Sequence, residues 1–116
     1  MGLFGRDVEE SVMTKTWKAT ERAVARIFKG KRISNTGLGS AVPDVVSEAY
    51  CVEVKHREKL PEWLKAAMAQ SLTNCRQGLL ALVVLHECGQ RHDNDLVMVR
   101  LADFIEWFGE VPGVER

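Results

Sequence analysis

Residues 43–55, PDVVSEAYCVEVK, contain the most informative pattern of the chain. A short apolar run (DVV) is separated by turn-like residues from a second run (YCVEVK), which predicts a strand. Because side chains alternate along a strand, Glu53 and Lys55 lie on one face of that second run. If the two runs pair as a hairpin, Asp44 approaches Glu53. Two carboxylates at close range then need a divalent cation or a shared proton to offset their repulsion.

Residues 11–29, which precede this stretch, predict an amphipathic helix whose apolar face includes Trp17, Val24 and Phe28. Glu21 lies in the middle of that face. A carboxylate buried there costs roughly a few kcal/mol unless it is paired, protonated or bound to a metal. Because of the two carboxylates farther along the chain, we favour a functional role for Glu21. The structural alternative is a glutamate at the edge of the core that pairs with a nearby Arg or Lys.

The same helix and the residues after it carry a basic surface, although the net charge of the chain is zero. Residues 1–40 contain eight Lys or Arg and four acids, whereas residues 41–116 contain eight and twelve. A local basic surface is typical of a protein that binds phosphate groups. We therefore expect contacts with a nucleic-acid backbone from Lys15, Lys18, Arg22, Arg26, Lys29, Lys31 and Arg32.

The remainder of the chain predicts alternating strands and helices. The expected elements are a strand at 31–33, a loop at 34–40, a helix at 61–77 that ends at Gly78, a strand at 79–85 buried on both faces, a polar hairpin loop at 86–94, a strand at 96–99 and a helix at 101–108. Gly30 is expected to end the first helix. This order predicts an α/β sandwich with a mixed central β-sheet flanked by helices. No repeat or linker marks a boundary, so we expect a single domain over residues 1–116.

Composition narrows the class of protein further. The 116-residue chain is 46% hydrophobic and 28% charged, which is typical of a soluble globular domain. No run reaches the ~18 apolar residues of a membrane span, and the N-terminus lacks the apolar core of a signal peptide. We therefore expect a cytoplasmic protein without a membrane partner. The three cysteines, an odd number without disulfide-framework spacing, agree with a reducing compartment and are expected in the core.

The loop at 86–94 contains half of a possible zinc site. Cys88 and His92 are four residues apart, and His86 is nearby. A structural zinc site has four ligands, and the sequence offers no partner pair of cysteines for this half-site. We therefore do not predict a structural zinc ion here.

Pro43-Asp44 and Glu53-Val54-Lys55 resemble the two halves of the signature of the PD-(D/E)XK nuclease superfamily, in the right order and at a suitable separation. The order of the expected elements is similar to the core of that fold from about 17 to 108. The resemblance implies a restriction-endonuclease-like sandwich. Within the superfamily, the chain looks most like the archaeal-type or phage-type Holliday junction resolvases. In that group a glutamate on the first helix joins the motif carboxylates, and Glu21 is the matching position.

The resemblance implies a magnesium-dependent endonuclease that makes paired, symmetric cuts in the phosphodiester backbone of a four-way DNA junction, with Mn²⁺ able to replace Mg²⁺. Asp44, Glu53 and the backbone carbonyl of Val54 would bind the ion, and Glu21 would add a ligand. Lys55 would position the attacking water and stabilise developing negative charge. The expected catalytic residues are thus the three acids and this lysine, and no small-molecule cofactor is implied.

Further residues are expected near this site by the same resemblance. Arg32 and Ser34 match an arginine and a Ser-Gly loop that approach the DNA backbone, although Ser40 competes with Ser34 for that role. Gln70, on the helix after the strand, matches a residue that supports the metal site through water, and a solvent-facing Gln70 is the alternative. The two-fold symmetry of a four-way junction implies a homodimer, because two symmetric cuts need two active sites.

Two other functions remain open. A nicking, flap-cutting or restriction-type nuclease of the same superfamily has the same motif residues and differs in its substrate. A non-catalytic DNA-binding module of the same fold is disfavoured, since such derivatives usually lose the Asp, Glu or Lys of the motif. If the motif is accidental, Glu21 interrupts an apolar helix face without a functional reason.

Overall fold

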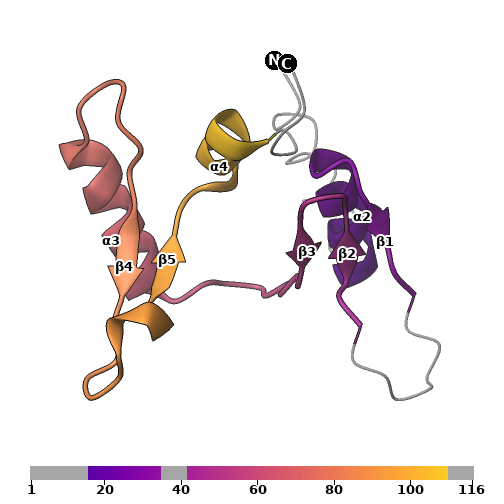
Figure 1. Ribbon diagram of the computed structural model, residues 1–116, viewed down its shortest axis with the longest axis horizontal. Helices are drawn as coiled ribbons and strands as arrows, with labels where there is room; N and C mark the ends of the chain where they lie inside the picture. Colours follow the sequence, from indigo (N-terminus) through magenta and orange to yellow (C-terminus); the bar gives the residue numbers. More distant parts are fainter. Residues whose placement is uncertain (1–15, 35–41, 110–116) are drawn as a thin grey trace. The chain divides into compact units, whose positions relative to one another are not determined.

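The computed structural model describes residues 16–34 and 42–109, and the chain divides into two compact units (Figure 1). The first unit consists of residues up to 57 together with those from 108, and the second consists of residues 58–107. The elements of the first unit are α2 (Trp17–Ile27), β1 (Lys31–Arg32), β2 (Val45–Val46) and β3 (Cys51–Val52). Those of the second are α3 (Glu62–Asn74), β4 (Val83–Leu85), the 3-10 helix η1 (His92–Asn94), β5 (Leu96–Met98) and α4 (Leu101–Phe108), whose last residue belongs to the first unit.

Helix α2 begins with a side-chain cap and ends with a left-handed residue. Thr16 Oγ1 accepts a hydrogen bond from the backbone N–H of Ala19 at 3.1 Å, which satisfies one donor of the first turn. At the other end, the N–H of Gly30 donates to the carbonyl of Ala25 at 2.8 Å, and Lys29 has a φ of 56°. This is the Schellman arrangement, with lysine in the position that glycine usually takes.

A glycine is needed at position 30 because the backbone of Val46 lies too close for a side chain, and not because of the backbone angles of Gly30. A Cβ atom at this position would lie 2.3 Å from the backbone oxygen of Val46, far inside van der Waals contact. The prediction that the first helix ends near Gly30 is confirmed, and the physical reason for the glycine is this close approach to β2. The absence of a side chain lets the end of α2 lie directly against the strand.

Strands β1, β2 and β3 form an antiparallel sheet in that order. Val45 pairs with Val52 and Val46 with Cys51, so the predicted hairpin is confirmed. Val45 is fully buried, and α2 packs against β1 and β2, as Figure 1 shows. The core of the first unit therefore lies between α2 and the middle strand of the sheet.

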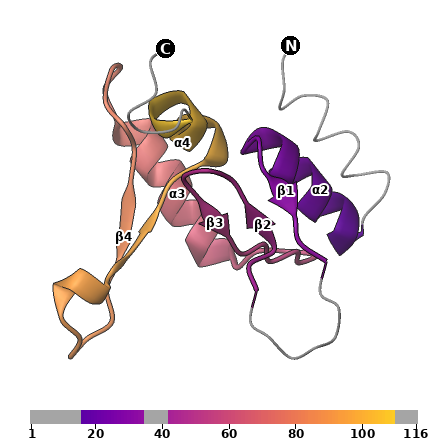
Figure 2. The same ribbon diagram turned by 45° about the vertical axis from the view of Figure 1, so that its right-hand side comes forward.

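In the second unit, α3 lies beside an antiparallel hairpin formed by β4 and β5 (Figure 2). The helix predicted in this region is confirmed, and its Met68 is buried. Ser71 Oγ, on the same helix, donates a hydrogen bond to the carbonyl of Leu82 at 2.9 Å and so joins α3 to the segment before β4. At the start of α4, hydrogen bonding to Asp103 raises the pKa of Arg100, against an opposing effect of burial.

The strand predicted at 79–85 is wrong in its extent and in its burial. Strand β4 covers only the last three of these residues, and Leu79, Leu82 and Val84 are 58%, 44% and 58% exposed. A continuous aliphatic run indicates burial on both faces only when the strand is central in a covered sheet. Here β4 pairs with β5 alone among the described strands, and its outer residues stay exposed.

The α/β class is confirmed, but the described strands are grouped differently from the expected mixed sheet. They form two antiparallel sheets, one of three strands and one of two. The expected restriction-endonuclease-like sandwich and the expected single domain stay predictions. Two local expectations are wrong: α3 ends at Asn74 rather than at Gly78, and Cys51 and Cys88 are exposed rather than in the core.

Within the described ranges, no helix combines the length and the apolar content that crossing a membrane would need.

Candidate functional site

The buried carboxylate of Glu21 is the centre of the candidate site. Glu21 is 6% exposed, and its Oε1 lies 2.6 Å from Nε of Arg32, on β1. The guanidinium of Arg32 also lies over the indole ring of Trp17, 5.8 Å from the ring centroid. The burial predicted for Glu21 is confirmed. Its charge is offset by an arginine, as the structural alternative expected.

Asp44 holds the open end of the β2–β3 hairpin. Its Oδ2 accepts a hydrogen bond from the backbone N–H of Val54 at 2.7 Å, and its backbone oxygen accepts one from the N–H of Ile33 at 2.9 Å. The register of the hairpin places Asp44 at the position opposite Glu53. Val54 was expected to act through its carbonyl, whereas the contact described here is made by its N–H.

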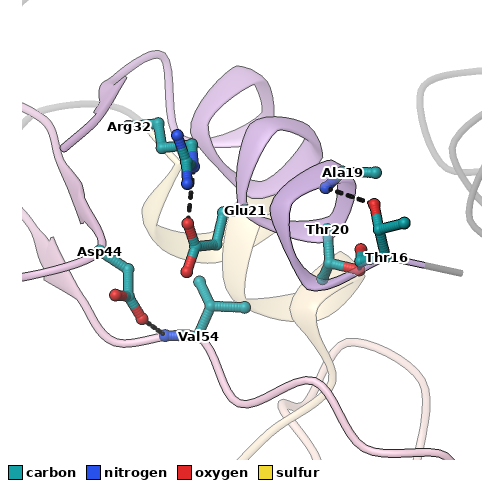
Figure 3. A network of polar contacts seen from close by, with 7 residues as sticks. All are labelled: Thr16, Ala19, Thr20, Glu21, Arg32, Asp44 and Val54. Carbon is teal, nitrogen blue, oxygen red and sulfur yellow. Dashed lines mark hydrogen bonds and ion pairs between the residues drawn. The ribbon is translucent and has the colours of Figure 1, made fainter. Parts of the chain in front are cut away.

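Figure 3 shows the carboxylates of Glu21 and Asp44 in the region between α2 and the hairpin, where Glu21 turns one oxygen toward Arg32 and Asp44 turns one toward the backbone N–H of Val54. Among the described residues, Oε2 of Glu21 and Oδ1 of Asp44 have no hydrogen-bond partner. Each carboxylate is thus held through one oxygen by a partner within the described residues. Carboxylate oxygens are the ligands that Mg²⁺ prefers in proteins.

Glu53 and Lys55 share a face, as the strand alternation predicts, and that face is exposed. Their side chains are 57% and 66% exposed, and Lys55 Nζ lies 3.1 Å from Glu53 Oε2. Strand β3 ends at Val52, but the alternation of exposed and half-buried residues continues as far as His56. The lysine therefore offsets the charge of the glutamate on the surface of the hairpin.

The three expected acidic ligands do not form one compact cluster. In the part of the chain that the structure describes, Glu21, Asp44 and Glu53 are not a group whose ligand oxygens all lie within 4.8 Å of one another. Glu21 is paired with Arg32, Asp44 accepts from the Val54 N–H, and Glu53 is paired with Lys55. Closing a metal site around all three acids would require Glu53 to leave the lysine.

Most of the basic residues predicted to contact nucleic acid lie within the described part of the chain, and these are exposed. Arg32 is the exception, because its pairing with Glu21 leaves it half-buried. Lys15 lies outside the described residues. The exposed members, along α2 and just after it, are Lys18, Arg22, Arg26, Lys29 and Lys31.

The remaining predicted residues lie in different parts of the chain. Ser34 is exposed at the end of the first described segment, and Ser40 lies outside the described residues. Gln70 is exposed on α3, in the second unit. The solvent-facing alternative for Gln70 is therefore confirmed.

A contact between Thr20 and His56 was not predicted from the sequence. Thr20 Oγ1, on α2, lies 2.7 Å from Nδ1 of His56 and 3.2 Å from the carbonyl oxygen of Thr16. The hydroxyl has one proton, so when it donates to Thr16 the His56 Nδ1–H must donate to it. The contact ties α2 to the segment after β3. No local pattern joins these residues, because they are far apart in the sequence.

The sequence analysis found only part of a second group of possible metal ligands, in the loop at 86–94. His86 and His92 were considered with Cys88, but the structure groups the two histidines with Asp95 instead. The ligand atoms of His86, His92 and Asp95 all lie within 4.8 Å of one another. The signal that would have found Asp95 is the hairpin itself, because strands that flank a loop bring its first and last residues together.

Comparison of the chain with protein-family models, with curated proteins and with solved structures gave no match. A functional assignment therefore rests on the residues and contacts described above.

Proposed function

We propose that this chain is a Mg²⁺-dependent DNA endonuclease of the PD-(D/E)XK type, which cuts four-way junctions as a cytoplasmic homodimer. The observation that carries the proposal is that Glu21 and Asp44 lie between α2 and the hairpin that bears Glu53 and Lys55. The restriction-endonuclease-like sandwich is part of the same proposal. It is supported by the order of the elements, in which a helix and three strands are followed by a helix, two strands and a helix.

The residues that would hold the ion are Glu21, Asp44, Glu53 and Val54, the last through its carbonyl. Bound Mg²⁺ supplies a more acidic water and neutralises negative charge on the phosphate. The hydrogen bond from Val54 N–H fixes the Asp44 carboxylate, so its second oxygen has a defined position before any ligand arrives. Arg32 offsets the charge of Glu21 and allows that carboxylate to be buried in advance.

Glu53 and Lys55 are the parts of the proposed site that change partners. An exposed ion pair contributes only about 0–1 kcal/mol, so separating these side chains costs little. The carboxylate of Glu53 would then be free to hold the ion. The ammonium of Lys55 would stabilise the negative charge that develops on the attacked phosphate in the transition state.

The exposed basic residues of α2 supply the contacts with the DNA backbone. Lys18, Arg22 and Arg26 extend along one helix and carry positive charge at the surface. Contacts of this kind are made to phosphates, depend strongly on salt and do not read the base sequence. Substrate choice then depends on the shape of the DNA. A second copy of the chain supplies the second active site that paired cuts require.

A non-catalytic DNA-binding module is the second candidate, and one observation favours it. Both Glu21 and Glu53 already have a basic partner, so their charges are offset without an ion. In that case the motif residues stabilise the hairpin and the basic residues alone bind DNA. The two candidates differ in whether Mg²⁺ produces cleavage.

The test is cleavage of a labelled, immobile four-way junction beside matched linear, nicked and flapped DNAs, in Mg²⁺ and in EDTA. Paired symmetric cuts near the junction centre, present only with Mg²⁺, are the expected result. Preferential cutting of flaps, nicks or plain duplex would keep the nuclease and reject the junction resolvase. Tight DNA binding without cleavage in Mg²⁺ or Mn²⁺ would select the non-catalytic module.

Matched variants separate chemistry from folding. Glu53→Ala and Lys55→Ala should abolish cleavage while leaving the fold intact, because both side chains are exposed. The control is the pair Glu62 and Lys65 on α3, whose charged atoms lie 2.9 Å apart and which is also exposed. Glu62→Ala and Lys65→Ala remove an equivalent surface ion pair and should cut the junction as well as the unchanged chain does.

A further inference from the structure

Three side chains of the second unit meet at the end of the β4–β5 hairpin. His86 Nδ1 lies 2.6 Å from Oδ1 of Asp95, and His92 Nδ1 lies 3.1 Å from the other oxygen, Oδ2. The two imidazole rings lie beside each other, with centroids 4.4 Å apart and planes inclined at 30°. One carboxylate thus faces two ring nitrogens. We call these three residues the His–His–Asp cluster.

The backbone fixes the positions of all three residues. Leu85 and Leu96 are the last cross-strand partners of the hairpin, so His86 and Asp95 take the next opposite positions. His92 is brought back toward them by η1, which the N–H of Asp95 closes with a hydrogen bond to the His92 carbonyl at 3.0 Å. Figure 2 shows this turn at the end of the hairpin. The cluster is therefore built on paired backbone rather than on a loose loop.

The donor set and its spacing fit a transition-metal ion. Imidazole nitrogens suit Zn²⁺ and its neighbours, whereas Mg²⁺ prefers oxygen ligands. Adjacent ligands of a tetrahedral Zn²⁺ ion lie about 3.3 Å apart, and the two contacts here are 2.6 and 3.1 Å, so a small outward shift makes room for an ion. The side chain of Asp95 is 11% exposed, while those of His86 and His92 are 34% and 84% exposed. An ion can thus reach the shielded carboxylate from solvent.

We propose that the His–His–Asp cluster binds a single divalent transition-metal ion, for which Zn²⁺ is the natural probe. The ion would replace the Nδ1 hydrogens as the partner of the carboxylate, and each neutral imidazole would carry its proton on Nε2. Three protein ligands leave a fourth position for water, as in zinc sites that bind a further ligand. A hollow lined in part by Trp63, His86 and Gln90 opens beside the cluster and gives solvent access to it.

This site goes beyond the proposed nuclease activity and does not depend on it. Its ligands are other residues, two of its three donors are nitrogens, and it is tested without DNA. Absence of junction cleavage would contradict the proposed nuclease activity but not the proposed zinc site. Absence of zinc binding would contradict the zinc site but not the nuclease activity.

The test is a Zn²⁺ titration of the tag-free full chain, stripped with EDTA and dialysed, in competition with a chromophoric chelator. One tightly bound Zn²⁺ per chain is the expected result. His92→Ala is the principal variant, because a side chain that is 84% exposed contributes little to folding. Its affinity for Zn²⁺ should fall by about a hundredfold or more, since the ion loses a direct ligand. His86→Ala and Asp95→Asn should weaken binding similarly.

Two control variants define the ligand set. Cys88→Ser removes the exposed thiol nearest in sequence, and His56→Ala removes the third histidine of the chain. Both should bind Zn²⁺ as the unchanged chain does. With Co²⁺ in place of Zn²⁺, visible ligand-field bands without a near-ultraviolet thiolate band should appear, because no cysteine is a ligand.

Several results would overturn the proposal. If Zn²⁺ fails to compete with the chelator, or if His92→Ala binds it as tightly as the unchanged chain, the cluster is only a hydrogen-bonded triad. Loss of binding in Cys88→Ser would assign the ion to a thiolate site instead. Circular dichroism in EDTA checks that each variant is folded, and His92→Gln gives the same comparison with a side chain of similar size.

Discussion

Two glutamates of the candidate site each have a basic partner, but their surroundings differ. Glu21 is 6% exposed and lies 2.6 Å from Arg32, whereas the side chain of Glu53 is 57% exposed and lies 3.1 Å from Lys55. Removing one partner of a buried pair costs about 3–5 kcal/mol, while an exposed pair contributes about 0–1 kcal/mol. The first pair is therefore part of the fold of its unit, and the second can change partners at little cost.

The difference matters for the proposed chemistry. A nuclease site needs some carboxylates whose positions are fixed in advance, and others that are free to meet the ion and the substrate. Glu21 and Asp44 belong to the first kind, because Arg32 and the N–H of Val54 hold them. Glu53 belongs to the second kind. Substitutions that act on stability and on cleavage separately can therefore test whether the two glutamates differ in this way.

The largest effect is expected from Arg32→Ala. The variant leaves the carboxylate of Glu21 buried without a positive partner, and the free energy of unfolding of the first unit should fall by about 3–5 kcal/mol. Urea denaturation followed by circular dichroism measures the change. The double variant Glu21→Leu with Arg32→Leu removes both charges and should recover most of the loss. A loss below about 1 kcal/mol in Arg32→Ala would mean that the pair is not buried in solution.

A smaller loss is expected from Gly30→Ala, which acts on the close approach between the end of α2 and the backbone of β2. The new Cβ would lie 2.3 Å from the backbone oxygen of Val46, which cannot turn away as a side chain would. We expect a loss of about 2–3 kcal/mol in thermal or urea unfolding. Gly89→Ala is the control, since its Cβ would meet open space and only its φ of 88° is strained, at about 1 kcal/mol. Equal losses in the two variants would contradict the clash.

Substitutions of Asp44 separate its structural bond from its proposed role as a ligand. Asp44→Ala removes the acceptor of the Val54 N–H and should lower stability by about 2 kcal/mol. Asp44→Asn keeps an acceptor oxygen and should lose less than about 1 kcal/mol. If Asp44 binds Mg²⁺, junction cleavage should vanish in both variants. Cleavage that persists in Asp44→Asn would leave Asp44 with the structural role alone.

The smallest stability effect is expected for the exposed pair. Glu53→Ala and Lys55→Ala should each change the free energy of unfolding by less than about 0.5 kcal/mol, because both side chains are surrounded by solvent. Thermal melting beside the unchanged chain measures this. A loss near that of Arg32→Ala would show that the pair is buried in solution and would remove the contrast between the two glutamates.

Local sequence patterns were sufficient to predict several parts of the fold. The helical period identified α2, and α4 at 101–108 was predicted with its observed bounds. The hairpin at 45–52 followed from two apolar runs around a turn, and strand alternation placed Glu53 and Lys55 on one face. These features depend on residues that are neighbours along the chain, so a single sequence contains their signal.

The run at 79–85 shows where local pattern fails. Its aliphatic residues are the same whether a strand has one neighbour or two, so the sequence predicts a central strand while the structure places most of them on an exposed hairpin segment. The number of neighbours is decided by packing between distant segments. Composition within the run contains no information about it.

From the sequence alone, Glu21 was expected to be buried, basic residues were expected along the first helix, and Asp44 was expected to approach Glu53 if the two runs paired as a hairpin. The partner of each charge could be read only from the three-dimensional structure: Arg32 for Glu21, the Val54 N–H for Asp44, and Asp95 for the two histidines of the second unit. The reason is that sequence patterns and charge pairing depend on residues at different separations along the chain. Period and alternation act over a few residues, whereas the partner of a buried charge depends on register and on the approach of segments that the chain order does not specify.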